Sequence, residues 1–121
     1  MVVARVEIPV KLPSLNDYVR ACRSGPYAGA KMKERIQRDV GWYIRQLPMI
    51  DGPCSINFTW TEKTRRRDLD NVAFAKKFIL DEMVTLGVLV DDSRRYVEGF
   101  TDAFRVGDDW SVIVEIEQER K

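Results

Sequence analysis

The hydrophobic pattern of this chain changes period once, near the middle, and that change restricts the folds open to it. From Cys54 to Thr61, apolar side chains alternate with polar ones, as in a β-strand with one buried face. From Asp70 onward the apolar residues recur every three or four positions, as in an amphipathic helix that Gly87 would end. The helical stripe consists of Val72, Ala75, Ile79, Met83 and Leu86. A strand must therefore lead through a charged segment directly into a helix.

The N-terminal half predicts a strand, an irregular stretch and a helix. Residues Val2 to Val10 are rich in β-branched side chains and precede a turn that starts at Pro13. The stretch from Asp17 to Gly29 is polar and has no regular period. A second helix follows, and Pro48 marks its end. Its apolar face consists of Met32, Ile36, Val40, Tyr43 and Leu47.

The C-terminal part predicts a β-hairpin. Two segments, Tyr96 to Arg105 and Trp110 to Glu117, are joined by a short turn that contains Gly107. Neighbouring strands of this kind favour antiparallel pairing. Taken together, the elements predict an α/β or α+β fold in which a mixed sheet packs with two main helices. No linker or repeat interrupts the chain, so we expect one domain over residues 1–121.

Size and charge restrict the classes of protein that fit. A chain of 121 residues with 45% hydrophobic content can build one small core, whose surface favours a partner subunit, so we expect an oligomer. The net charge of +1 excludes a strongly basic, histone-like protein. Any affinity for nucleic acid must therefore come from local patches of charge.

The cysteines and the hydropathy predict the compartment. Cys22 and Cys54 fit no CxxC metal or redox pattern, which favours two reduced thiols in a cytoplasmic protein. The N-terminus does not read as a leader peptide, and no window approaches the length of apolar chain that spans a membrane. We therefore expect no membrane association.

Clustered charges predict the chemistry. They are Arg65, Arg66, Arg67, Asp68 and Asp70, followed further along by Asp91 and Asp92. Mg²⁺ prefers oxygen ligands and is held by few carboxylates together with substrate phosphate oxygens. It can activate water without any histidine, and this chain has none. Arginines bind phosphates through paired, charge-assisted hydrogen bonds. The combination suits a metal-dependent nuclease.

Each of these residues also has a purely structural interpretation. Asp68 or Asp70 could cap the helix, and the Asp91-Asp92 pair could serve only in a turn. A rotation of about 100° per residue places Asp70 and Lys77 on one sector of the helix, opposite its apolar stripe. Lys77 could contact a phosphate, or it could simply pair with Asp81 one turn on.

Three segments resemble a known family. They are Arg66-Arg67-Asp68-Leu69-Asp70-Asn71, Lys76-Lys77-Phe78-Ile79-Leu80-Asp81 and Gly87-Val88-Leu89-Val90-Asp91-Asp92. In this order they resemble the signature of RusA-type Holliday junction resolvases, small endonucleases frequently encoded by prophages. The resemblance extends more loosely to an N-terminal strand, Pro13-Ser14-Leu15-Asn16 and a basic helix before the motif.

The resemblance implies an activity and a set of site residues. It implies a homodimer that binds four-way DNA junctions and makes paired, symmetric, Mg²⁺-dependent nicks during recombination and repair. The metal-binding aspartates would be Asp68, Asp70 and Asp92, with Asp91 assisting. Extra residues after Asn71 leave two candidates for the family's catalytic lysine, Lys76 and Lys77. We prefer Lys77, because it shares the helical sector of Asp70.

The DNA-binding surface is predicted from the remaining cations. Arg65, Arg66, Arg67 and Lys76 would bind backbone phosphates, and Lys31, Lys33, Arg35 and Arg38 could extend the basic surface or could form a solvated helix face. Other functions remain open: a flap or other branched-DNA nuclease of the same chemistry, or a catalytically silent DNA-binding module. A structural Ca²⁺ site is disfavoured, because EF-hand spacing is missing.

Overall fold

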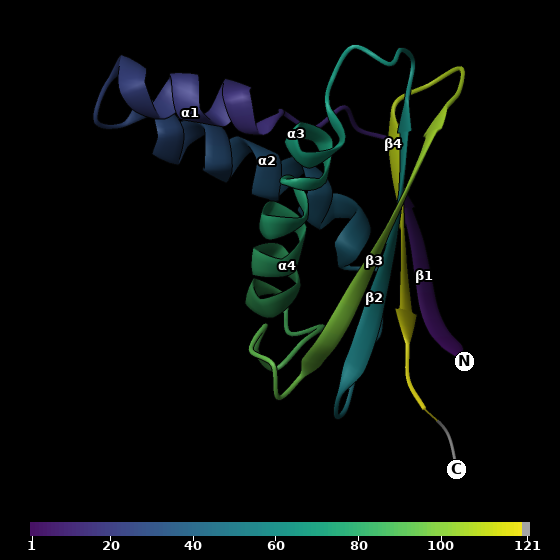
Figure 1. Ribbon diagram of the computed structural model, residues 1–121. Helices are drawn as coiled ribbons and strands as arrows, with labels where there is room; N and C mark the ends of the chain where they lie inside the picture. The colour runs from purple at the N-terminus through teal and green to yellow at the C-terminus, as the bar shows by residue number, and fades with distance from the viewer. Residues whose placement is uncertain (120–121) are drawn as a thin grey trace.

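A four-stranded mixed sheet with helices on one face forms the protein in our computed structural model, which describes residues 1–119 (Figure 1). The strands are β1 (Val2–Ile8), β2 (Cys54–Glu62), β3 (Val97–Val106) and β4 (Ser111–Glu117). Their order across the sheet is β1-β4-β2-β3, and only β2 and β3 run parallel. The predicted fold class, a small α+β domain with a mixed sheet, is confirmed.

The predicted C-terminal hairpin is wrong, because β2 lies between β3 and β4. β2 is a central strand whose backbone pairs on both edges, and its side chains Ile56, Phe58 and Trp60 are all nearly inaccessible. The turn after β3 passes over the end of β2, where the Gly107 backbone N–H donates to the Glu62 carbonyl at 2.9 Å. A Cβ at Gly107 would lie 2.8 Å from Thr61, so the crossing requires glycine there.

The first helix was not predicted. α1 (Leu15–Ser24) occupies most of the stretch from Asp17 to Gly29 that was interpreted as irregular. Leu15, Tyr18, Val19 and Cys22 do recur at helical spacing, although none of them is fully buried, and the start of the helix is fixed by a capping box between Ser14 and Asp17. The helix predicted from Met32 to Leu47 is confirmed as α2 (Ala28–Ile44).

The helix predicted from Asp70 to Leu86 is divided into α3 (Leu69–Ala73) and α4 (Lys76–Thr85). Bonds of the i→i+3 type tighten the chain between them: the Lys77 N–H donates to the Phe74 carbonyl, and the next N–H donates to the Ala75 carbonyl, each at 3.1 Å. The predicted end at Gly87 is confirmed. Its φ of 77° and the two hydrogen bonds that return to the last turn of α4 form a Schellman motif.

The core fills the space between the helices and one face of the sheet (Figure 1). Val6, Val114 and Phe58 lie in one row across β1, β4 and β2, and all three are buried against the helices. Phe78 and Met83 of α4 are buried as well. Both cysteines are free thiols. In residues 1–119, no helix is long and apolar enough to cross a membrane.

The capping box generates a stability prediction. The Ser14 hydroxyl accepts a hydrogen bond from the Asp17 N–H at 3.1 Å, and the Asp17 carboxylate accepts one from the Ser14 N–H at 3.0 Å. Removing such a cap lowers the free energy of unfolding by about 1 kcal/mol, so Ser14→Ala should lower it by that amount in urea denaturation. Asp108→Asn, in the exposed turn after β3, is the control and should change little.

The same box predicts a pH dependence. The pKa of Asp17 is lowered from 3.8, mainly by the hydrogen bond from the Ser14 backbone, with Arg20 and Arg67 adding a smaller effect and burial opposing it. A folded-state pKa below the unfolded one stabilises the protein above the unfolded value. The stability advantage of wild type over Asp17→Asn should therefore be complete at pH 7 and decline as the pH falls below 3.8. A difference that is independent of pH would contradict the assignment.

Candidate functional site

Four charged side chains meet between α2, α4 and the turn before β3. The Lys77 ammonium lies 3.0 Å from the Asp81 carboxylate and 3.7 Å from the Asp92 carboxylate. Lys33 of α2 lies 3.3 Å from the other oxygen of Asp81. These side chains line a groove of about 450 Å³. The structure therefore brings together Lys77 and Asp92, two of the residues predicted for the site.

The charge of Lys77 is fixed by these neighbours. Its pKa is raised from 10.5, first by the hydrogen bond to Asp81 and then by the charges of Asp81 and Asp92, while partial burial opposes the rise. The ammonium is consequently charged throughout the neutral range. Its side chain is 58% exposed, so it remains accessible to a ligand. Lys77 can act there as a cation and not as a base.

Lys76 points to a different place, although it is the next residue. Its ammonium pairs with Asp102 of β3 and lies 5.5 Å and 5.1 Å from the ring centres of Phe58 and Phe100. The Trp60 indole N–H donates to the other oxygen of Asp102 at 2.9 Å. Lys76 therefore ties α4 to the sheet, and its predicted phosphate contact stays a prediction.

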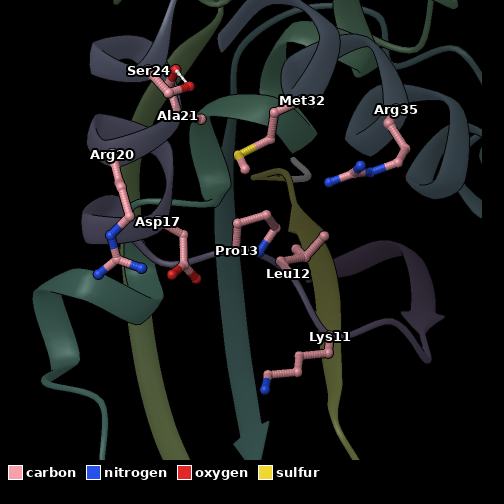
Figure 2. A pocket seen from close by; sticks show the side chains of 9 residues that line it. All are labelled: Lys11, Leu12, Pro13, Asp17, Arg20, Ala21, Ser24, Met32 and Arg35. Atoms are coloured by element: carbon pink, nitrogen blue, oxygen red, sulfur yellow. Dashed lines mark hydrogen bonds between the residues drawn. The ribbon is translucent and has the colours of Figure 1, made fainter. Parts of the chain in front are cut away.

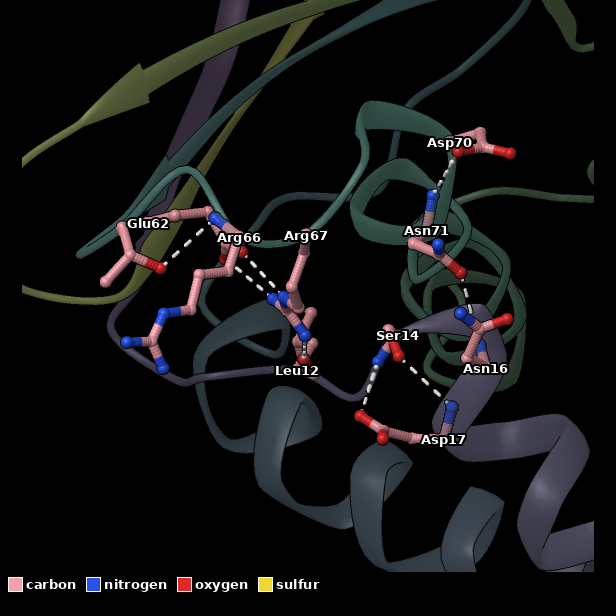
Figure 3. A network of polar contacts seen from close by, with 10 residues as sticks. Leu12, Ser14, Asn16, Asp17, Glu62, Arg66, Arg67, Asp70 and Asn71 are labelled. Atoms are coloured by element: carbon pink, nitrogen blue, oxygen red, sulfur yellow. Dashed lines mark hydrogen bonds and ion pairs between the residues drawn. The ribbon is translucent and has the colours of Figure 1, made fainter.

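The two aspartates of the motif lie at the start of α3. Asp68 occupies the N-cap position, but its side chain makes no capping hydrogen bond. Asp70 accepts a hydrogen bond from the Asn71 N–H at 3.0 Å, and its carboxylate points away from the helices (Figure 3). Both side chains are exposed, and within residues 1–119 neither forms an ion pair. Helix capping by the side chain therefore does not explain why an aspartate stands at position 68.

Asn71 connects this motif to α1. Its side-chain oxygen accepts a hydrogen bond from the Asn16 backbone N–H at 3.2 Å (Figure 3). That N–H belongs to the first turn of α1, where backbone donors lack partners inside the helix. The amide of Asn71 thus supplies a partner from outside and holds α1 against α3.

The three arginines divide into two kinds. Arg67 forms two hydrogen bonds of 2.7 Å to the Glu62 carboxylate and donates a third, of 2.8 Å, to the Leu12 carbonyl (Figure 3). Its side chain is only 18% exposed. Arg65 and Arg66 are exposed. Arg67 therefore fixes the loop that carries the motif, whereas Arg65 and Arg66 are accessible to a phosphate.

The predicted metal ligands are not gathered into one group. In the part of the chain from residue 1 to 119, no three Asp, Glu, Cys or His side chains are placed to hold a metal ion together. Asp92 is engaged by Lys77, and Asp91 accepts a hydrogen bond from the Asp92 N–H at 2.8 Å, as expected for a turn. Asp68, the N-cap residue, and Asp70 lie at the start of α3.

The donor chemistry of Asp68 and Asp70 nevertheless fits magnesium. Mg²⁺ keeps several waters and often takes only one or two protein carboxylates, with substrate phosphates completing its shell. Asp68 and Asp70 are two such carboxylates at the first turn of one helix, both exposed and without an ion-pair partner in residues 1–119. Asp92 does not join them in this arrangement.

The cations of α2 do not form one surface. Lys33 faces the groove of Lys77, whereas Arg35 lines a second groove between α1 and α2 (Figure 2). Lys31 and Arg38 are exposed. Three partners that fix these residues were not predicted, namely Glu62, Asp102 and Asn16. Asp102 and Asn16 lie far along the chain from Lys76 and Asn71, so no local spacing could have indicated these two contacts, whereas Glu62 lies only five residues before Arg67.

Comparison with known proteins adds no assignment: no protein-family model and no curated protein matches this chain.

The clamp of Arg67 predicts a change in stability. Arg67→Ala would leave the Glu62 carboxylate, only 14% exposed, without its partner. We expect the free energy of unfolding to fall by about 2–3 kcal/mol in guanidinium denaturation. Arg67→Lys should recover little of that loss, because an ammonium cannot make the paired contact. Arg65→Ala, at an exposed position, is the matched control, and equal losses in both alanine variants would contradict the clamp.

Proposed function

We propose that the protein is a Mg²⁺-dependent endonuclease of the RusA type that cuts four-way DNA junctions. The observation that carries the proposal is the contact between Lys77 and Asp92. The two residues come from separate segments of the resemblance, and they meet at 3.7 Å in an open groove. Asp68 and Asp70, exposed beside two free arginines, supply the carboxylates that the chemistry needs.

In the proposed hydrolysis of a phosphodiester, the charged residues of the chain would have different roles. Asp68 and Asp70 would hold the ion, which when bound lowers the pKa of a water and offsets negative charge on the phosphate. Lys77, held protonated by Asp81, would stabilise charge that develops on the phosphate. Arg65 and Arg66 would bind flanking phosphates, and Arg67 would position the loop.

Two symmetric cuts require two sites. A twofold homodimer presents two identical sites to a junction of matching symmetry, so we include a dimer in the proposal. DNA recombination and repair in the cytoplasm would be the setting. The two free thiols are compatible with that compartment.

A second candidate is a branched-DNA-binding module without catalysis. The observation in its favour is that Asp92 is engaged by Lys77 while Asp68 and Asp70 lie on α3. A flap nuclease of the same chemistry is a third candidate. Substrate comparison and metal dependence separate the three.

The first test is cleavage of a labelled four-way junction in Mg²⁺ or EDTA, beside a flap and a linear duplex of the same sequence. Wild type should make paired symmetric nicks in the junction alone, and EDTA should abolish them. Asp70→Asn should lower the rate by about 100-fold or more while binding persists, since it removes a charge on which the reaction depends. Asp108→Asn, in the turn after β3, is the control. Binding of the junction without any cut would favour the silent module, and preferred cutting of the flap would favour the third candidate.

The two neighbouring lysines give opposite expectations. Lys77→Met should lower kcat by about 100-fold, because it removes a cation beside the reacting phosphate. Lys76→Met should instead lower the free energy of unfolding, by up to about 1 kcal/mol, because Asp102 loses its partner. Single-turnover rates and urea denaturation measure the two effects. A greater loss of kcat in Lys76→Met than in Lys77→Met would transfer the role to Lys76.

A further inference from the structure

We propose that the groove between α1 and α2 holds one unpaired nucleotide of a DNA strand, with its base on the groove floor and its phosphates on the rim. The inference rests on the proposed function, because it names how such a protein would recognise an open branch point. It concerns a part of the surface that the candidate site does not use.

The groove has the size and the floor that a base requires. Its volume is about 500 Å³, within the range of about 300–1,000 Å³ that is typical of small-ligand pockets. The floor is made by Leu12, Pro13, Ala21 and Met32, and the Met32 sulfur points toward its centre (Figure 2). Flat bases taken out of a stack are held between apolar surfaces of this kind.

The rim carries the charge that a phosphate requires. Lys11, Arg20 and Arg35 stand on three sides of the floor (Figure 2). The only carboxylate that lines the groove among the described residues is Asp17, and it is already engaged by the Ser14 backbone N–H at 3.0 Å. The rim therefore carries three positive charges and one negative charge, and it is positive overall. Lys11 is further ordered by the Trp110 ring, whose centre is 4.3 Å from its ammonium.

An apolar floor inside a positive rim selects a nucleotide over other ligands. Proteins that bind single strands combine cations along the backbone with surfaces on which bases lie. A paired base in a duplex cannot enter such a groove, whereas a base at a branch point can be extruded at a modest energetic cost. The groove would therefore favour open DNA over linear duplex.

The groove also borders the motif loop. The Leu12 carbonyl, on the groove floor, accepts the hydrogen bond from Arg67 at 2.8 Å. Asn16, at the start of the helix that forms one wall, is bonded to Asn71 at 3.2 Å. A strand with one nucleotide in the groove would thus continue toward Asp68 and Asp70. The groove would therefore bind DNA next to the phosphate that the proposed reaction cleaves.

Methionine methyl groups offer a direct test by NMR. The chain has four methionines, of which Met32 lines the groove, Met83 is buried, and Met1 and Met49 are exposed elsewhere. Titration of the full-length, methyl-labelled protein with tetrathymidylate should shift the Met32 resonance and leave the other three nearly unchanged. An abasic tetramer of the same charge should produce a much smaller shift. No shift at Met32, or equal shifts with both tetramers, would overturn the proposal.

Charge variants provide the second measurement. Arg20→Gln and Arg35→Gln, both at exposed positions, should each weaken tetrathymidylate binding several-fold and lower the slope of log K against log salt by about 0.7. Arg5→Gln, an exposed arginine on β1, is the matched control and should change neither quantity. Equal losses in all three variants would overturn the proposal.

The outcomes distinguish this inference from the proposed function. Cleavage of junctions without a Met32 shift would support the proposed nuclease and overturn the proposal that the groove binds a nucleotide. A Met32 shift without any cleavage would support the groove in a DNA-binding module. A shift with a tetraglutamate peptide but not with tetrathymidylate would assign the groove to acidic peptides and overturn the proposal.

Discussion

The pairing of β2 on both edges is the constraint on which the rest of the structure depends. β2 occupies the centre of the sheet, with β4 on one side and β3 on the other, so its backbone hydrogen bonds are satisfied on both edges while Ile56, Phe58 and Trp60 are buried beneath the helices. The chain leaves the end of this strand at Glu62 and has to pass from the sheet to the helical layer within a few residues. The charged loop is that passage, so its position follows from the position of β2.

Arg67 fixes the conformation of the charged loop between β2 and α3. Its guanidinium joins Glu62, at the end of β2, to Leu12, just before α1, so three segments meet at one side chain. Asn71 adds a second connection to α1 through Asn16. The loop that carries Asp68 is therefore held at both ends by hydrogen bonds, which lets the carboxylates stay exposed without additional support of their own. An arginine run that reads as uniform in sequence thus contains one structural and two free members.

The apolar period of the sequence predicted several of the helices and strands, but it did not predict α1 or the order of the strands in the sheet. The strand from Cys54 and the helix from Met32 follow their patterns, because burial of one face is a local property of the sequence. α1 was not predicted, although Ser14 and Asp17 carried a capping signal and the apolar residues from Leu15 to Cys22 recur at helical spacing. The polar residues between them and the absence of a fully buried side chain made its pattern less evident than that of α2. The C-terminal hairpin failed because strand order depends on contacts between distant segments. The contacts of Lys76 with Asp102 and of Asn71 with Asn16 were not predicted for the same reason.

The choice between Lys76 and Lys77 shows how distant contacts decide a local question. Consecutive residues on a helix point about 100° apart, so one of the two lysines must face away from the groove. Asp102 lies opposite Phe58 in the parallel register of β3 and so stands on the helix side of the sheet, where it attracts Lys76. Lys77 is left to the groove, where Asp81 and Asp92 keep it protonated. In the proposed reaction, a cation at that position would offset the repulsion between the carboxylates and an incoming phosphate, which is the condition under which an acidic site could accept a polyanionic substrate.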